Sequence, residues 1–301
     1  MRRLGGALAA VTIVGLLAAL PVSGRTDGRL RNGLIALARG GGVYVLDPAT
    51  GRAHRITDGV ASGLLYTDVA WSPDGRRLAV TTLHELVTMD ADGGHLRAVA
   101  SFSRQAAVWS VAWSPDGQEL AISGGFEPRR SEIRLLRLRD RRLRRVASSF
   151  RVFYYALSWT PDGRRLVYAE SPSGGDDSVY SMRIDGSNPR RISSGGAPRL
   201  SRDGTRIAFN FWNDVRVMQA NGSRVRVVKR RQHLVAYSVL AWSPDGRWLL
   251  VDRMDRRPIP RPRSVSALLV VSADGRKTRH VGPFFRGSFT SALGAAWAPA
   301  R

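Results

Sequence analysis

Cysteine is absent from this chain of 301 residues, and histidine occurs only five times. Without a thiol the protein can form neither a disulfide bond nor a thiolate metal site, and it has no cysteine nucleophile. The histidines are scattered, with no pair at metal-ligand spacing on one predicted element. A Gly-x-Ser-x-Gly segment, which would indicate an α/β-hydrolase nucleophile, is also missing. We therefore expect no catalytic residue, no metal and no cofactor.

Lysine is nearly absent too, because only Lys229 and Lys277 occur, yet the chain is strongly basic. Its 47 Lys and Arg residues against 24 Asp and Glu residues give a net charge of +23, which arginine carries almost alone. Such a charge permits binding to nucleic acid, anionic lipid or acidic wall polymers. The arginines are spread through the whole chain, so they also fit a GC-rich coding sequence that places arginine at exposed positions. This distribution disfavours nucleic acid and leaves an anionic envelope component open as a partner.

The only long hydrophobic run lies at the N-terminus. Two arginines precede an apolar stretch over residues 4–20, and small residues follow up to Gly24. This arrangement is typical of a secretory signal peptide. We predict a signal peptide over residues 1–24 and, for a bacterial protein, a secreted or periplasmic location. An uncleaved anchor with residues 4–22 in the bilayer is the alternative, because the run is nearly long enough to span it.

A five-residue phrase recurs along the rest of the chain. It reads Trp-Ser/Thr-Pro-Asp-Gly, and one degenerate copy has lost its Trp and its Pro. The copies begin at Trp71, Trp113, Trp159, Leu200 and Trp242. Pro fixes φ at the first corner of a tight turn, Asp bonds to nearby backbone, and Gly accepts the positive φ that follows. Apolar runs flank each copy, so each predicts a β-hairpin whose Trp packs between neighbouring sheets.

A second turn recurs half a period later, and Asp90-Ala91-Asp92-Gly93 is its clearest copy. One period of about 40–45 residues thus holds four short strands, A to D, which is the unit of a propeller blade. The first strand B, at residues 34–37, lacks a strand A, whereas the last strand A, at 295–299, lacks a strand B. We therefore predict an all-β, six-bladed β-propeller of four-stranded blades over residues 25–301. The C-terminal strand should close the ring by pairing with the N-terminal strands.

These repeats resemble the TolB-like family of WD40-like propellers. The hallmark of that family is the Trp-Ser-Pro-Asp-Gly phrase followed by a turn of the type Met-Asp-Ala-Asp-Gly, which residues 89–93 match. The resemblance covers about residues 30–301. It implies an extracytoplasmic propeller that docks proteins or senses ligands.

Variation in loop length distinguishes the two faces of the predicted disc. The A–B and C–D turns share one face, here called the turn face, and the B–C and D–A connections share the other, the variable-loop face. Binding usually resides in variable loops on a rigid scaffold. One B–C connection contains Arg256, Arg257, Arg261 and Arg263 among alternating prolines. This segment is either a stiff basic arm that docks on an acidic partner or a solvated insertion.

Aromatic residues ahead of the strand-A segments form a second candidate site near the mouth of the channel. They are Tyr66, Trp109, Tyr155 and Tyr237. Rings with polar tips suit a pocket for a small molecule or a peptide. Packing between blades is the alternative explanation for these rings.

The sequence favours a non-catalytic, exported and monomeric scaffold that binds a protein or another envelope partner through the variable-loop face. The alternative is a channel-mouth hydrolase or lyase that acts on a lactone or a sugar, with or without a metal. Such an enzyme needs polar groups that converge on the channel, where Asp68 is the only predicted acid. Asp176 and Asp177 could ligate Ca²⁺, although a solvated Gly/Ser-rich loop is the simpler explanation.

Overall fold

The computed structural model describes most of the chain after its first 32 residues. The described residues are 33–39, 41–58, 66–127, 130–255, 265–282, 285–286 and 294–299. All regular elements in these ranges are strands, and none of these ranges contains a helix of the length and apolarity that a bilayer requires. The predicted signal peptide over residues 1–24 lies outside them.

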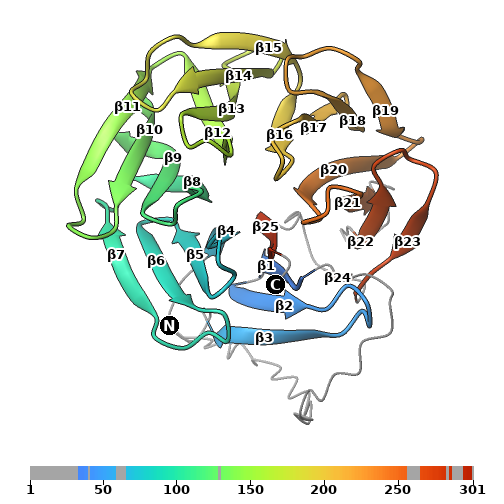
Figure 1. Cartoon of the computed structure of the whole chain (residues 1–301), viewed down its shortest axis with the longest axis horizontal. Helices are drawn as coiled ribbons and strands as arrows, with labels where there is room; N and C mark the ends of the chain where they lie inside the picture. The colour runs from blue at the N-terminus through green and yellow to red at the C-terminus, as the bar shows by residue number, and fades with distance from the viewer. Residues whose placement is uncertain are drawn as a thin grey trace, which may run out of the picture.

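Six antiparallel sheets are arranged radially around a central axis, with strand A innermost and strand D at the rim (Figure 1). Blade 1 comprises β25 (Gly294–Trp297), β1 (Ile35–Arg39), β2 (Gly42–Leu46) and β3 (Ala53–Asp58). Blade 2 comprises β4 (Tyr66–Trp71), β5 (Arg77–Thr82), β6 (Glu85–Asp90) and β7 (Arg97–Ser101). Blade 3 comprises β8 (Ala107–Trp113), β9 (Glu119–Glu127), β10 (Arg130–Arg137) and β11 (Leu143–Ser149).

The other three blades follow the same order. Blade 4 comprises β12 (Val152–Trp159), β13 (Arg165–Pro172), β14 (Ser178–Arg183) and β15 (Arg190–Ser194). Blade 5 comprises β16 (Gly196–Leu200), β17 (Arg206–Phe211), β18 (Asp214–Gln219) and β19 (Arg226–Lys229). Blade 6 comprises β20 (Val235–Trp242), β21 (Trp248–Asp255), β22 (Val265–Ser272) and β23 (Thr278–His280), and β24 (Phe285–Arg286) pairs with β22. The predicted six-bladed, all-β propeller is confirmed.

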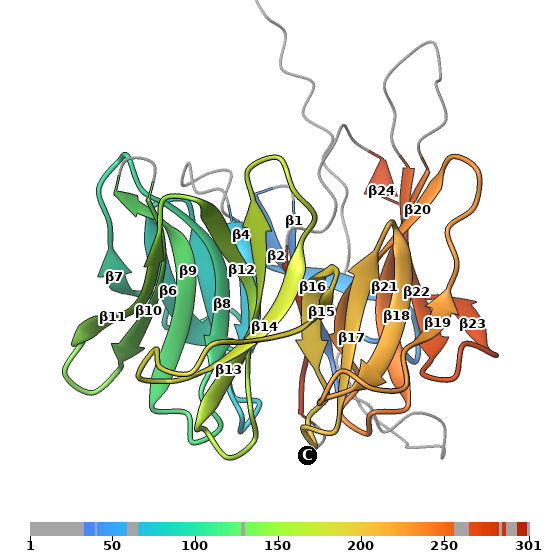
Figure 2. The same ribbon diagram turned by 90° about the horizontal axis from the view of Figure 1, so that it is seen from above.

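The ring closes where the two ends of the described chain meet. β1 lies between β2 and β25, and its register with β25 runs from Ile35 opposite Trp297 to Ala38 opposite Gly294. The C-terminal strand therefore supplies strand A of blade 1, as predicted. Figure 2 shows the strands running between the two faces of the disc, with the variable-loop face at the top, where β24 lies.

The turn of the repeated phrase uses its serine as well as its aspartate. In blade 2, Ser72 Oγ donates to Asp74 Oδ1 at 2.6 Å and accepts from the Arg77 amide at 2.9 Å. Gly75 follows with φ of 67°, a value that glycine adopts without strain. The Ser72 hydroxyl and the Arg76 amide hold the pKa of Asp74 below its ordinary value. The repeated aspartate thus serves the turn, and its position on the turn face separates it from the variable loops.

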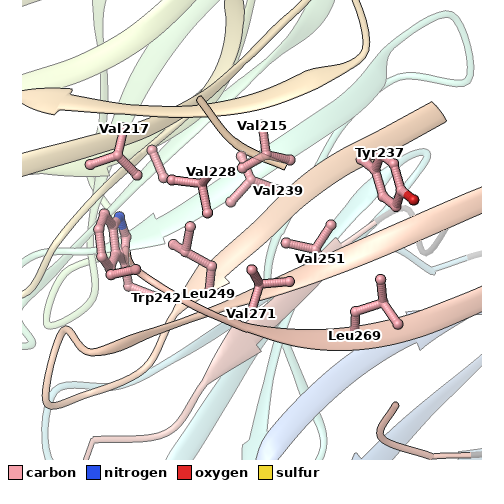
Figure 3. Close-up of a cluster of buried hydrophobic side chains, with 12 residues drawn as sticks. Val215, Val217, Val228, Tyr237, Val239, Trp242, Leu249, Val251, Leu269 and Val271 are labelled. Carbon is pink, nitrogen blue, oxygen red and sulfur yellow. The ribbon is translucent and has the colours of Figure 1, made fainter. Parts of the chain in front are cut away.

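Tryptophan side chains join blades 3, 4 and 6 to the preceding blade. Trp113 Nε1 donates to the Ala70 carbonyl of blade 2 at 3.2 Å, and Trp159 Nε1 donates to Ala112 of blade 3 at 3.2 Å. Aliphatic side chains fill the space beside each ring. Figure 3 shows this packing between blades 5 and 6, where Val215 and Val217 face Val239, Leu249 and Val251. The strand-A tryptophan thus packs between neighbouring blades, as the sequence predicted.

Removal of the indole that closes blade 1 should destabilise the propeller. Trp297 is 8% exposed, and its Nε1 donates to the Gly33 carbonyl at 2.7 Å. Trp297→Ala should lower the free energy of unfolding by about 3–5 kcal/mol, because a buried aromatic side chain and its hydrogen bond are lost together.

Urea denaturation followed by circular dichroism measures this loss. The matched control is Trp212→Ala, which removes an indole that is 61% exposed and should change stability by less than about 1 kcal/mol. Equal losses in the two variants would show that ring closure does not depend on Trp297.

Candidate binding site

A pocket opens on the variable-loop face between blades 4, 5 and 6. Its volume is about 410 Å³, within the size range of ligand sites in proteins. Its walls come from the start of β12, the β13–β14 connection, the start of β16, the β17–β18 hairpin and the inner strands of blade 6. The lining residues are Tyr155, Gly175, Asp176, Asp177, Gly195, Gly196, Ala197, Asn210, Phe211, Trp212, Asn213, Tyr237, Ser238 and Met254.

One wall of the pocket is held by a tyrosine and a carboxylate. The Tyr155 hydroxyl donates a short hydrogen bond to Asp177 Oδ2, and the Gly195 amide donates to the Asp177 carbonyl at 2.7 Å. Burial, followed by the contact with Asp177, raises the pKa of Tyr155, so the phenol stays protonated and acts as the donor. A Cβ on Gly196 would collide with both Tyr155 Oη and Asp177 Oδ2. Glycine at position 196 therefore leaves space for this pair.

The opposite wall carries an exposed tryptophan on a tight hairpin. Phe211 pairs with Asp214, which leaves a two-residue loop of Trp212 and Asn213 with φ of 50° and 67°. Two positive φ values are the geometry of the type I′ turn, where Asn and Gly are favoured and a bulky residue is unusual. The left-handed backbone costs Trp212 roughly 1–2 kcal/mol. Its ring remains 61% exposed, so burial does not offset this strain.

Beneath the pocket, Asn210 connects blade 5 to blade 6. Its Nδ2 donates to the Tyr237 carbonyl at 2.7 Å, and its Oδ1 accepts from the Val239 amide at 3.0 Å. Among the described residues, the inner strands of neighbouring blades share no backbone hydrogen bonds, so these two side-chain bonds link blade 5 to blade 6 at this point. The floor of the pocket is thus rigid, and Asn210 has its side-chain groups engaged.

Two opposite charges lie in the channel below the mouth. Asp68 is 7% exposed and accepts from the Val69 amide at 2.9 Å and the Val111 amide at 3.0 Å. Arg199 donates through Nε to the Leu240 carbonyl at 2.6 Å. The two side chains do not approach within ion-pair distance, but each charge acts on the other. Burial raises the pKa of Asp68 to about 6, and the Arg199 charge opposes this rise.

The four aromatic residues predicted to form a site occupy two different environments. Tyr66 and Tyr237 are each 3% exposed and pack in hydrophobic clusters between blades, although Tyr237 also lines the pocket. Trp109 is half-buried, with its ring centroid 5.5 Å from that of Phe153. Of the four, the pocket brings together only Tyr155 and Tyr237. The arginines of the predicted basic arm lie outside the described residues: Arg256, Arg257, Arg261 and Arg263.

Sequence reasoning missed Arg199, and it did not predict that Trp212 and Asn213, in a variable B–C connection, line a pocket. A signal for Arg199 was present, because the position before the strand-A tryptophan is otherwise Ala or Ser, as at Ala70 and Ser158. A large cation at that slot indicates a side chain that enters the channel. Trp212-Asn213 follows a run over residues 207–211 that is apolar except for Asn210, so it could have been predicted as a hairpin loop, but not as a pocket wall.

Within the described ranges, no three His, Asp or Glu side chains are grouped so that they could hold a metal ion. Asp176 and Asp177 are adjacent in sequence, but Asp177 Oδ2 is engaged by Tyr155. Asp68, the acid predicted at the channel, is held by two backbone amides and faces the charge of Arg199.

Comparison with known proteins agrees with this fold. A family model described as the TolB beta propeller domain matches residues 79–261, which is more than half of the chain. The chain belongs to the TolB β-propeller domain family. No curated protein matches the chain in sequence.

Solved structures with the same fold include members of the TolB family and a more distant propeller. TolB from Acinetobacter baumannii is 20% identical with a TM-score of 0.67, and the match covers 89% of this chain and 67% of that chain. A TolB candidate from Agrobacterium tumefaciens is 20% identical with a TM-score of 0.68, covering 89% and 97%. A chain in a nidogen/laminin complex is 11% identical with a TM-score of 0.69, covering 89% and 99%. At these identities the likeness shows the fold alone.

The buried acid of this TolB-family propeller should make its stability depend on pH. The pKa of Asp68 is about 6 in the folded protein, against an ordinary value of 3.8 for a solvent-exposed aspartate, so the folded state binds the proton more tightly. Stability should therefore rise as pH falls from 7 through 6 towards 4.5, by about 2 kcal/mol from this group. At lower pH the turn aspartates, such as Asp74, lose their stabilising charge and reverse the trend.

Urea unfolding at pH 7, 6 and 5 measures this dependence in the wild type and in Asp68→Asn. The variant cannot titrate at position 68, so its stability should change less over the same interval. A wild-type stability that falls between pH 7 and 5, or an equal rise in both proteins, would contradict the assignment to Asp68.

Proposed function

We propose that this protein is an exported, non-catalytic scaffold that binds a protein partner through its variable-loop face. The proposal rests on the propeller fold, on the signal-like sequence of residues 1–24 and on the side chains that this face exposes. Propellers of one architecture serve many functions, so the side chains of the site, and not the fold, indicate the function.

The observation that carries the proposal is the unequal distribution of exposed apolar side chains between the two faces. On the variable-loop face, large exposed hydrophobic residues among those described are Leu83, Phe150, Phe153, Trp212 and Leu234. On the turn face they are Leu34, Leu96 and Val225. Every exposed aromatic ring in this set belongs to the variable-loop face. Aromatic side chains that stay exposed on one face are typical of protein interfaces.

A patch over blades 3 and 4 supports the same conclusion. Phe150 and Phe153 are 65% and 49% exposed, and the Phe153 ring packs edge-on against Trp109. The Arg130 guanidinium lies 4.3 Å above the Phe150 ring. Trp, Phe and Arg are all enriched at protein interfaces relative to the rest of the surface. A partner that covers this patch would gain contact with rings that are already held in place.

Charge favours an acidic partner. The net charge of +23 creates a positive field that attracts negative surfaces and speeds association with them. Part of this charge also has a structural role, because arginines on rim strands, such as Arg190 and Arg226, discourage the pairing of exposed strand edges with other chains. Nucleic acid is not proposed as a partner, since the arginines occur in every blade and form no continuous stripe.

A channel-mouth enzyme finds less support among the described residues. A hydrolase or lyase would need several acids, amides or imidazoles converging on one point of the channel. Asp68 lies in the channel, and its raised pKa would suit a general base. Its two carboxylate oxygens, however, accept hydrogen bonds from the amides of Val69 and Val111. The same strand slot in blade 3 holds Ser110, which accepts from Leu157 in the same manner. The presence of an acid at position 68 is therefore explained by a structural role, because its side chain links blade 2 to blade 3.

Substitution of the phenylalanine patch should abolish capture of the partner. Phe150→Ser with Phe153→Ser should reduce capture from bacterial envelope extracts at least roughly tenfold, because two exposed rings at an interface centre each contribute about 1–2 kcal/mol. Quantitative mass spectrometry of captured proteins provides the measurement.

The matched control for this experiment is Leu96→Ser with Val225→Ser, which removes exposed apolar side chains from the turn face. It should capture the same partner as the wild type. Equal loss in both double variants, or no loss in either, would refute binding through the variable-loop face.

The arginine arm extends the same proposal. Replacement of Arg256, Arg257, Arg261 and Arg263 by alanine should weaken capture of an acidic partner, and the weakening should be larger at low ionic strength than at high. Capture of the partner at two salt concentrations tests this. An unchanged partner at both concentrations would show that the segment is a solvated insertion.

A further inference from the structure

The pocket between blades 4, 5 and 6 is acidic in a protein that is otherwise strongly basic. Lys and Arg outnumber Asp and Glu by 47 to 24 in the chain, yet the fourteen lining residues include two aspartates and no Lys, Arg or His. Four of the lining residues are aromatic: Tyr155, Phe211, Trp212 and Tyr237. Carboxylates beside aromatic rings form the chemical surroundings that a cation prefers.

Neither pocket carboxylate forms an ion pair within the described part of the chain. Asp176 makes no hydrogen bond or ion pair with a described residue, and Asp177 is bound only through Oδ2, by the neutral Tyr155 hydroxyl. Several other described carboxylates are engaged by charged or amide donors. Asp214, for example, pairs with Arg216 at 3.3 Å and accepts from the Arg231 amide at 2.7 Å. The two pocket carboxylates therefore keep the capacity to bind an external cation.

Trp212 adds the aromatic face that such a cation would use. Two other rings of the pocket already have a cation nearby, since the Arg216 guanidinium lies 4.3 Å from the Phe211 ring and Lys229 Nζ lies 5.5 Å from the Tyr237 ring. No described cation lies over Trp212. Tryptophan binds cations best among the aromatic residues, and this one is exposed in a strained left-handed turn. A strained and exposed residue at a pocket is an indication of function.

The pocket is also organised before a ligand arrives. The Tyr155 bond and the Gly195 amide fix the Asp177 loop, and Asn210 fixes the floor. A preformed site loses little conformational entropy on binding. Its volume of about 410 Å³ admits one extended side chain with its charged head.

We infer that this pocket binds the guanidinium or ammonium group of an arginine or lysine side chain presented by the protein partner. The cation would lie between the Trp212 ring and the carboxylates of Asp176 and Asp177. The inference rests on the proposed scaffold function and names the chemistry of one contact. The basic surface of the scaffold would repel a generally basic partner, so the partner should present this cation from an otherwise neutral or acidic segment.

Isothermal titration calorimetry with three blocked peptides tests the inference. The peptides have the sequence Gly-Ser-X-Ser-Gly, where X is arginine, lysine or citrulline, and citrulline has nearly the shape of arginine without its charge. The arginine and lysine peptides should bind with measurable heat. The citrulline peptide should bind at least roughly tenfold more weakly, which corresponds to the loss of about 1.4 kcal/mol.

Three variants locate the contact. Asp177→Asn keeps an acceptor for the Tyr155 hydroxyl but removes the charge, and Asp176→Asn removes the second charge. Trp212→Leu removes the aromatic face. Each should weaken the arginine peptide roughly five- to tenfold. The control is Glu85→Gln, which removes one negative charge from the variable-loop face at the start of β6 in blade 2, outside the pocket. It should leave the affinity within about twofold.

Equal affinities for the arginine and citrulline peptides would overturn the inference, as would binding of a neutral oligosaccharide such as maltotriose in place of the peptides. No effect of the aspartate variants would overturn it as well. The test of the scaffold function uses Phe150 and Phe153 on blades 3 and 4. A failure of the pocket experiment therefore leaves that result standing, and the two failures can be distinguished.

Discussion

The hydrogen bond from a strand-A indole to the carbonyl of the preceding blade is the interaction on which the ring depends. Trp113, Trp159 and Trp242 make it at 3.2, 3.2 and 2.7 Å, whereas the Trp297 indole donates to the Gly33 carbonyl within blade 1. Inner strands of neighbouring blades share no backbone ladder, so their polar groups need another partner. The indole supplies one at the point where its ring also excludes water. Closure by β25 and β1 then leaves no blade without neighbours on both sides.

Blade 5 has no tryptophan at the end of its strand A, so it cannot donate this hydrogen bond to blade 4. Leu200 stands in place of the tryptophan and Arg202 in place of the proline. Where other blades place proline beside the next glycine, Arg206 donates to the Gly246 carbonyl at 2.8 Å and lies 4.8 Å above the Trp242 ring. Arg206 thus takes the place of the proline contact between blades 5 and 6, where the Trp242 indole still donates to the Arg199 carbonyl at 2.7 Å. The same irregular blade carries Arg199 and the Trp212 hairpin.

The repeat period was enough to predict the blade number, the four-stranded sheets and the closing strand, because each turn residue has a local conformational reason. The aromatic site was predicted less well. Tyr66 and Tyr237 stand five residues before the strand-A tryptophan and are buried, whereas Trp109 and Tyr155 stand four before it and are half-buried. In the inner strands of blades 2, 3, 4 and 6, a bulge inserts one residue. Side chains on the two sides of the bulge therefore do not continue the simple alternation between the two faces of the sheet. Bulges depend on the neighbouring blade, so sequence alternation alone does not reveal them.

The placement of charge follows from the same geometry. Five inner strands with small side chains before their tryptophan leave room in the channel, and Arg199 enters that room from the blade whose pattern is broken. Its charge would be unfavourable there without Asp68 facing it, and burial of Asp68 would be unfavourable without Arg199. Asp176 and Asp177 in the pocket, in contrast, form no ion pair within the described part of the chain. This difference between the compensated acid of the channel and the two pocket carboxylates is the physical basis of the proposed cation contact.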